Sequence, residues 1–161
     1  MSDNLTNLNA CDIQKYQQNR FPLLFIDEIL EAVPGKYAKG YKNFTYNEWF
    51  FPAHFEDEPV VPGFVQIEAL TQVFLMTFLT FPEYKGKKTG FISVSQRFWK
   101  KIVPGDCLNI EAELKFFRRG LAKGISSGYV KGELACQANL EIAIPDVMQA
   151  FRPKMIDNGD K

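Results

Sequence analysis

The apolar positions of this chain predict one long helix set among alternating strands. From Gly63 to about Thr80 the residues are apolar on nearly every side of a helical projection, and Glu68 is the only charged one. Pro82 then ends the helix, because proline lacks the amide hydrogen that a helix interior requires. A helix that is hydrophobic all round is enclosed by the rest of its fold, so this segment is expected at the centre of the core.

The segments on both sides of this helix have the short apolar runs and two-residue alternation of strands. The clearest case is Leu108, Ile110 and Ala112, which share one face while polar and charged residues occupy the other. The expected strands are residues 23–33, 36–44, 91–99, 107–117, 121–130 and 133–144. Two strands, one helix and four more strands predict an α+β fold, an antiparallel sheet of about six strands wrapped around the helix of residues 63–80.

Both ends of the chain differ from this central pattern. Residues 1–10 are polar and are expected to be disordered, and Asp12 is the expected cap of a short helix. Residues 147–161 follow the closing Pro145 and are expected to form a loose tail. The sequence therefore predicts a single domain over residues 11–146.

The composition is that of a globular protein with a sizeable core. The chain has 161 residues, of which 46% are hydrophobic and 24% are charged, values typical of one folded domain. Cys11, Cys107 and Cys136 form neither a disulfide framework nor a zinc-binding pattern, which favours a reducing compartment. The polar N-terminus lacks the apolar core of a signal peptide, and Glu68 argues against membrane insertion of the central helix. A cytoplasmic protein is expected, and nothing indicates a metal, a nucleotide or a nucleic acid.

Charge is distributed unevenly although the formal net charge is zero. Residues 85–131 contain 11 basic and three acidic residues, a net charge of +8, whereas residues 1–84 have a net charge of −6. A basic segment of this kind indicates an acidic macromolecular partner for part of the surface. The alternative is an ordinary solvated surface of mixed charge.

The stretch that leads into the central helix contains the candidate chemistry. His54 is the only histidine, and Glu68 follows inside the apolar helix. Desolvation holds a buried carboxyl in its protonated form, whereas a histidine near pH 7 is largely neutral, so the two make a candidate acid and base. Taken singly, each also has a structural explanation, as a surface histidine and as a buried carboxyl satisfied by hydrogen bonds.

Three segments carry a resemblance to a known family: NRFPLLFIDEI, FFPAHFEDEPVVPGFVQIEALTQ, and RFWKKIVPGD followed by FFRRGLAKG. Together they resemble the β-hydroxyacyl-acyl carrier protein dehydratases, which have the hotdog fold. The most specific match is the order and spacing of His54, Pro62-Gly63 and Glu68. The resemblance extends over roughly residues 19–144.

The resemblance implies dehydration of a (3R)-hydroxyacyl group on acyl carrier protein to the trans-2-enoyl product, in fatty acid synthesis or a related lipid or polyketide pathway. His54 would remove the C2 proton and Glu68 would protonate the leaving hydroxyl. Gly63 would present its backbone N–H to the thioester oxygen. Gln72, one helical turn after Glu68, would hold the carboxyl in place. No cofactor is implied.

The same resemblance implies a site shared between subunits and a surface for the carrier protein. His54 of one subunit would face Glu68 of the other in a homodimer, with a trimer of dimers, a hexamer, as the larger assembly. The acyl-tunnel residues would be Phe55, Phe64 and Ile67. The acidic carrier protein would dock on basic residues of two segments that the resemblance places near each other: Lys100, Lys101, Arg118 and Arg119. The alternative is that these four are ordinary solvated turn charges.

At four positions the chain departs from the family pattern. Ala53 replaces the glycine usual before the histidine, Glu56 and Asp57 replace a proline–glycine pair, and Asn19 replaces a histidine. These changes leave the acid–base pair in place. Two other interpretations stay open: a hotdog thioesterase, in which Glu68 would help water attack the thioester, and a non-catalytic acyl-binding or regulatory protein, which the altered histidine loop would favour.

Overall fold

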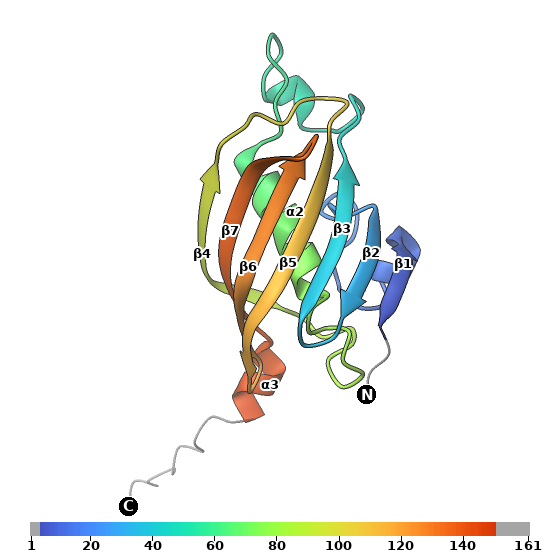
Figure 1. The fold of residues 1–161 in the computed structure, drawn as a ribbon, viewed down its shortest axis with the longest axis vertical. Helices are drawn as coiled ribbons and strands as arrows, with labels where there is room; N and C mark the ends of the chain where they lie inside the picture. Colours follow the sequence, from blue (N-terminus) through green and yellow to red (C-terminus); the bar gives the residue numbers. More distant parts are fainter. Residues whose placement is uncertain (1–3, 151–161) are drawn as a thin grey trace, which may run out of the picture.

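The structure, a computed structural model, describes residues 4–150 and contains one antiparallel sheet wrapped around one helix (Figure 1). The strands are β1 (Leu5–Asn9), β2 (Glu28–Val33), β3 (Tyr37–Asn43), β4 (Gly90–Phe98), β5 (Cys107–Arg118), β6 (Leu121–Val130) and β7 (Glu133–Ala143). The helices are α1 (Ala10–Ile13), α2 (Gly63–Leu75), α3 (Pro145–Ala150) and the short 3-10 helix η1 (Phe51–Ala53). The strands pair in the order β1-β2-β3-β5-β6-β7-β4, and every neighbouring pair is antiparallel. The α+β prediction is thus confirmed, with seven strands in place of about six.

The core lies between the inner face of the sheet and α2. Along β5, Leu108, Ile110 and Ala112 are buried while the residues between them are exposed, as a two-residue alternation predicts. α2 is buried over most of its length, and Leu70 at its middle is fully enclosed. Glu68, the one carboxylate of this helix, is half-buried and lies at the boundary of the core.

Strand β6 lies close against α2, and three small residues allow this approach. A Cβ added at Gly124 would lie 2.4 Å from Cε2 of Phe74, and one added at Gly128 would lie 3.3 Å from Cδ2 of Leu70. Between the two glycines, the buried Ser126 hydroxyl donates a hydrogen bond of 2.9 Å to the Leu70 carbonyl. These positions fix the separation between helix and sheet.

The N-terminus is more ordered than its polar sequence predicts. The expectation of disorder over residues 1–10 is wrong for β1, which pairs with β2 at the edge of the sheet. Asn9, rather than Asp12, caps α1, because its side-chain oxygen accepts the backbone N–H groups of Cys11 and Asp12. At the other end, α3 includes the first residues of the predicted tail, and residues 151–161 lie outside the described part.

Two elements are shorter than the sequence pattern suggests. α2 ends at Leu75 rather than at about Thr80, because most of the backbone N–H groups that follow bond to carbonyls three residues back and tighten the chain into turns. Strand β2 begins only at Glu28. The segment expected to open it, Leu23–Phe25, uses backbone groups to bind the side chain of Gln72 instead of a neighbouring strand.

Candidate active site

Glu68 projects from the middle of α2 and is held by two amide side chains. Its Oε1 accepts one hydrogen bond from Nδ2 of Asn19, at 2.9 Å, and another from Nε2 of Gln72, at 2.8 Å. Both donors point at the same oxygen, so Oε2 is the oxygen left to carry a proton. This geometry suits a carboxylic acid that donates its proton from one defined position.

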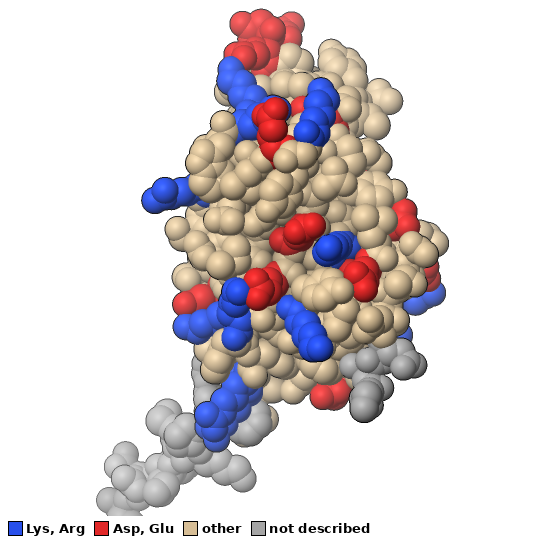
Figure 2. Space-filling view, in the orientation of Figure 1, with Lys and Arg blue, Asp and Glu red and all other residues tan. Residues whose placement is uncertain are grey.

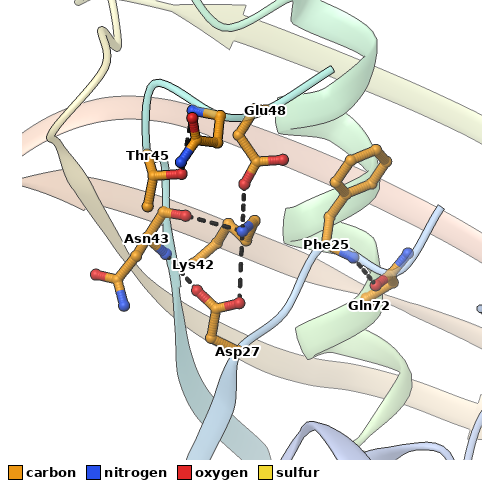
Figure 3. A network of polar contacts seen from close by, with 8 residues as sticks. Phe25, Asp27, Lys42, Asn43, Thr45, Glu48 and Gln72 are labelled. Atoms are coloured by element: carbon orange, nitrogen blue, oxygen red, sulfur yellow. Dashed lines mark hydrogen bonds and ion pairs between the residues drawn. The ribbon is translucent and has the colours of Figure 1, made fainter. Parts of the chain in front are cut away.

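Gln72 is itself fixed by the segment that precedes β2. Its Oε1 accepts the backbone N–H of Phe25 at 2.8 Å (Figure 3). Its Nε2 also donates to the carbonyl of Leu23 at 2.7 Å. Because Gln72 is fully buried, these bonds set the orientation of its amide and present Nε2 to Glu68. The structure thus brings Gln72 and Glu68 together, as their spacing of one helical turn predicts.

Burial raises the pKa of Glu68 above its usual value, because the low-dielectric surroundings disfavour a charged carboxylate. The hydrogen bonds from Gln72 and Asn19 act in the opposite direction, since they stabilise the charged form. Burial is the larger of these effects. A carboxyl with a raised pKa keeps its proton to higher pH and suits a general acid.

Two cavities meet at Glu68. The first, of about 290 Å³, has a wall of apolar side chains: Leu23, Phe25, Phe64, Ile67 and Phe91. The second, of about 450 Å³, includes polar side chains, among them Asn19, Arg20 and Lys88. Two of the expected acyl-tunnel residues, Phe64 and Ile67, therefore line the apolar cavity, whereas the third, Phe55, lines neither.

His54 lies just after η1, on the long connection between β3 and α2 at the top of Figure 1. Its Nδ1 is 3.0 Å from the carbonyl oxygen of Val60. Because a carbonyl only accepts, Nδ1 is the donor in this contact, and in the neutral form of the ring Nε2 then carries the lone pair. The ring stacks on Phe55, with ring centroids 4.2 Å apart. His54 therefore presents Nε2 as a candidate base, and Phe55 packs on that base.

Gly63 opens α2 and lies beneath Phe98 of β4. A Cβ at position 63 would come within 3.0 Å of Cζ of Phe98, so this close packing favours glycine. Pro62 is the cap residue, and no side chain within residues 4–150 caps this helix by a hydrogen bond. The backbone N–H groups at the start of α2 therefore remain suited to an oxygen that gains negative charge.

His54 and Glu68 make no direct contact in the described residues. Across residues 4–150 no hydrogen bond joins the two side chains. Neither of the cavities at Glu68 includes His54 in its wall. Within residues 4–150 the two side chains therefore share neither a hydrogen bond nor a cavity wall.

The four basic residues expected to bind a carrier protein lie at opposite ends of the sheet. Lys100 and Lys101 follow β4 at the upper end of Figure 1, and both form ion pairs with carboxylates of the chain. Arg118 and Arg119 lie at the turn between β5 and β6, at the lower end. The 12 residues of β5 separate the two groups, a span of roughly 36 Å. A single chain therefore does not place the two segments near each other.

Known proteins resemble this chain over most of its length. A family model described as a FabA-like domain matches residues 18–139. The 3-hydroxyacyl-[acyl-carrier-protein] dehydratase FabZ of Alkaliphilus metalliredigens is 41% identical over 138 residues, which cover 85% of this chain and 94% of that protein. FabZ of Desulforamulus reducens is 42% identical over 141 residues, which cover 87% and 98%. The chain belongs to the FabZ dehydratase family.

Solved structures agree with the hotdog fold of this FabZ family member. The dehydratase heterocomplex ApeI:P from Xenorhabdus doucetiae matches with a TM-score of 0.71 and 11% identity, over 88% of this chain and 97% of that chain. The PaaI protein of E. coli, from a phenylacetic acid degradation operon, matches with a TM-score of 0.56 and 9% identity, over 71% and 80%. At such low identities the likeness concerns the fold alone.

Two further polar residues of the FabZ family member contribute to the site region and are absent from the sequence-based candidates. Asn19 donates to Glu68 across 49 positions of sequence, a contact that no local pattern signals. Lys42 of β3 is buried and forms ion pairs below the connection that carries His54. Its signal in the sequence is its place on the same face of a predicted strand as Ala38 and Gly40.

Proposed function

We propose that the chain dehydrates a 3-hydroxyacyl group carried on acyl carrier protein to the trans-2-enoyl product in fatty acid biosynthesis. The observation that carries the proposal is a half-buried acid, Glu68, in the wall of an apolar cavity of a FabZ family member. The two amides that hold Oε1 of this acid give further support. The reaction moves only protons and water, so it requires no cofactor.

In the proposed mechanism His54 is the base and Glu68 is the acid. The lone pair on Nε2 of His54 removes a proton from C2 of the acyl chain, and the electrons of that C–H bond form the C2–C3 double bond. Oε2 of Glu68 gives its proton to the C3 hydroxyl, which leaves as water. The N–H of Gly63 donates to the thioester oxygen while negative charge builds there. The cycle closes when the imidazolium loses its proton and the carboxylate regains one.

The test of this function is incubation of the protein with 3-hydroxyacyl and trans-2-enoyl thioesters. Interconversion of the two supports the dehydratase. Release of free thiol without interconversion would indicate a thioesterase. Binding of the acyl group without either reaction would indicate an acyl-binding or regulatory protein.

We infer that the working site combines two subunits of a homodimer. His54 lines neither cavity at Glu68, and a second copy would supply the base to those cavities. β4 is an edge strand whose outer rim is free to pair within the described residues, and it carries exposed apolar side chains such as Phe91, Ile92 and Phe98. Such an edge suits pairing with its own two-fold copy. A trimer of these dimers is the larger assembly that the family resemblance implies.

Asn19→Leu is expected to move the alkaline loss of kcat/KM to higher pH. The hydrogen bond from Asn19 lowers the pKa of Glu68, so its removal raises that pKa further. The acid works only while protonated, and activity is therefore lost as pH rises through its pKa. The pH profile of kcat/KM measures the shift. Gln18→Leu is the matched control, because the Gln18 amide donates to the Gly86 carbonyl rather than to Glu68. An alkaline limb that does not move would mean that another group sets it.

We propose the lower end of the sheet as the docking surface for the acidic carrier protein, with Arg118 and Arg119 as its main contacts. Both arginines are exposed at that end of the sheet. The upper end has the acidic residues 56–58 at the tip of the projecting connection (Figure 2). That tip would repel an acidic partner. The two lysines therefore contribute less to docking than the two arginines.

The register of the sheet supports the same surface. Arg118 pairs with Leu121, Leu121 pairs with Ala143, and Ala143 pairs with Gly90, so Arg118 and Gly90 lie in one row across the sheet. Gly90 lines the polar cavity at Glu68. A carrier protein bound at this end would hold its acyl arm near that cavity.

Arg118→Glu is expected to lower kcat/KM for a carrier-bound substrate roughly tenfold at low salt, because charges at a docking rim mainly speed encounter. The loss should shrink as salt rises, since the Debye length is only about 8 Å at physiological ionic strength. Lys101→Glu is the comparison variant and should lose less. A short thioester without the carrier should react normally with both variants. Equal loss with both substrates would indicate damage to the fold. No loss with either would mean that Arg118 is an ordinary solvated charge with no role in docking.

The domain boundaries and the location of the protein are also proposals. We infer a single domain that begins at β1 rather than at residue 11, because β1 is part of the sheet. The three cysteines are unpaired, which supports the reducing, cytoplasmic compartment expected from the sequence. Within residues 4–150, no helix combines the length and apolar character needed to span a membrane.

A further inference from the structure

Lys42 is a charged residue on the buried face of β3. It shares that face with Ala38 and Gly40, and its side chain is only 10% exposed. Burial of an ammonium group is costly unless charged or polar partners surround it. The ion pairs of Lys42 with Asp27 and Glu48 must therefore offset this cost.

The Nζ of Lys42 contacts two carboxylates and a carbonyl (Figure 3). It lies 2.6 Å from Oε1 of Glu48, 3.4 Å from Oδ1 of Asp27 and 2.8 Å from the carbonyl oxygen of Asn43. Asp27 is fixed further, because its Oδ2 accepts the backbone N–H of Asn43 at 2.6 Å. Without the ammonium, the carboxylates of Asp27 and Glu48 would share one half-buried space and repel each other.

Glu48 begins the part of the connection that leads to His54. The backbone N–H of Phe51 donates to the Glu48 carbonyl at 3.2 Å, and the N–H of His54 donates to the Phe51 carbonyl at 3.2 Å. Between them, the buried ring of Phe50 packs against Phe44 and Phe51. A displacement of Glu48 is therefore passed through two hydrogen-bonded turns to His54.

Asp27 continues the segment that supports the acid. Two residues before it, Phe25 donates its backbone N–H to Gln72, and the amide of Gln72 donates to Glu68. Figure 3 shows Phe25 and Gln72 beside this network, with the amine of Lys42 between Asp27 and Glu48. Through Asp27 and Glu48, Lys42 thus joins the segment that holds Gln72 to the connection that carries His54.

We propose that Lys42 is a positioning residue for dehydration, which ties the connection bearing His54 to the sheet and to the Asp27 segment of the same chain, so that each subunit holds in place the base and the acid that it contributes to the two sites of the dimer. This inference rests on the proposed function, in which both side chains act on the substrate. Lys42 lines neither cavity at Glu68 and acts only through its partners. A displacement of about 1 Å at a reacting group can cost about 100-fold in rate, so a small shift of the connection has a large effect.

Lys42→Met keeps the length of the side chain and removes its charge. We expect kcat to fall at least about tenfold, with KM nearly unchanged, because the variant alters neither cavity wall nor the docking arginines. Lys42→Arg keeps a cation in place and is expected to recover most of the lost kcat. Lys123→Met is the matched control, since it breaks a partly exposed pair with Glu141 on neighbouring strands, and it should leave kcat unchanged.

A second measurement does not depend on activity. His54 is the only histidine in the sequence, so the untagged full-length protein has one set of imidazole ring signals in its NMR spectrum. We expect Lys42→Met to shift these signals and Lys123→Met to leave them in place. Glu48→Gln keeps the shape of its side chain but weakens the contact with Lys42, and it should shift the ring signals in the same direction by a smaller amount.

The two measurements together decide the proposal. Unchanged kcat and unchanged ring signals in folded Lys42→Met would overturn it, and a loss that Lys42→Arg does not reverse would also count against it. Should Lys42→Met fail to fold, Glu48→Gln decides by the same criteria. If the parent protein does not dehydrate 3-hydroxyacyl thioesters, the dehydratase proposal fails, whereas the ring signals still show whether Lys42 fixes the position of His54.

Discussion

His54→Ala and Glu68→Gln are each expected to lower the rate of dehydration at least about 10²-fold, the usual loss for a positioned acid or base. His54→Ala removes the lone pair that takes the C2 proton. Glu68→Gln keeps an oxygen that accepts from Asn19 and Gln72, so the site retains its shape, but an amide does not release a proton at C3. The rate of enoyl thioester formation from a 3-hydroxyacyl thioester measures both effects.

The stability of Glu68→Gln separates this loss of activity from unfolding. Burial raises the pKa of Glu68 in the folded state, so its protonated form favours folding. That contribution is complete below the unfolded pKa and is lost as pH rises through the folded pKa. A neutral glutamine avoids the cost of a buried carboxylate, and the variant should therefore be no less stable than the parent at neutral pH. Near-normal turnover by either folded variant would remove that residue from the mechanism.

A mixture of the two inactive variants is expected to recover activity. In a heterodimer of His54→Ala and Glu68→Gln subunits, one site contains both original groups and the other contains neither, because a two-fold axis places the same patch on both subunits. With random exchange, half of the dimers are mixed and half of their sites are complete. The mixture should therefore reach about one quarter of the parent rate.

The control for this experiment is a mixture that cannot form a complete site. His54→Ala mixed with the double variant His54→Ala/Glu68→Gln lacks the histidine in every subunit and should stay inactive. Subunit exchange is shown independently, for example by mass spectrometry of isotope-labelled chains. Exchange without recovery of activity would mean that both catalytic groups come from one chain.

The elements that depend on local periodicity can be predicted from the sequence. The apolar run after Pro62 and Gly63 predicts where α2 begins, because proline and glycine mark the entry and burial on all sides continues from there. Its end differs, since the backbone N–H groups after Leu75 bond mostly to carbonyls three residues back, and the hydroxyls of Thr77 and Thr80 bond to carbonyls in the same turns. Hydropathy does not register this local competition for hydrogen bonds.

The contacts that shape the candidate site join distant parts of the chain, and local patterns do not reveal them. Gln72 and Phe25 are 47 positions apart, and their bond removes residues before Glu28 from the strand that their apolar character predicts. Lys42 could be predicted from the sequence only in part. Its alternation with exposed neighbours predicts a charged residue on a buried face, although the partners, Asp27 and Glu48, emerge only from the fold.

The glycines of β6 restrict how this scaffold can be engineered to accept other acyl groups. With Gly124 and Gly128 at the contact and Ser126 bonded to its backbone, α2 has no room to move toward the sheet and loses a hydrogen bond if it moves away. The size of the apolar cavity therefore depends on the volumes of the side chains in its wall, such as Phe64 and Ile67. Libraries that vary those positions and leave β6 untouched should change substrate range with the least loss of folded protein.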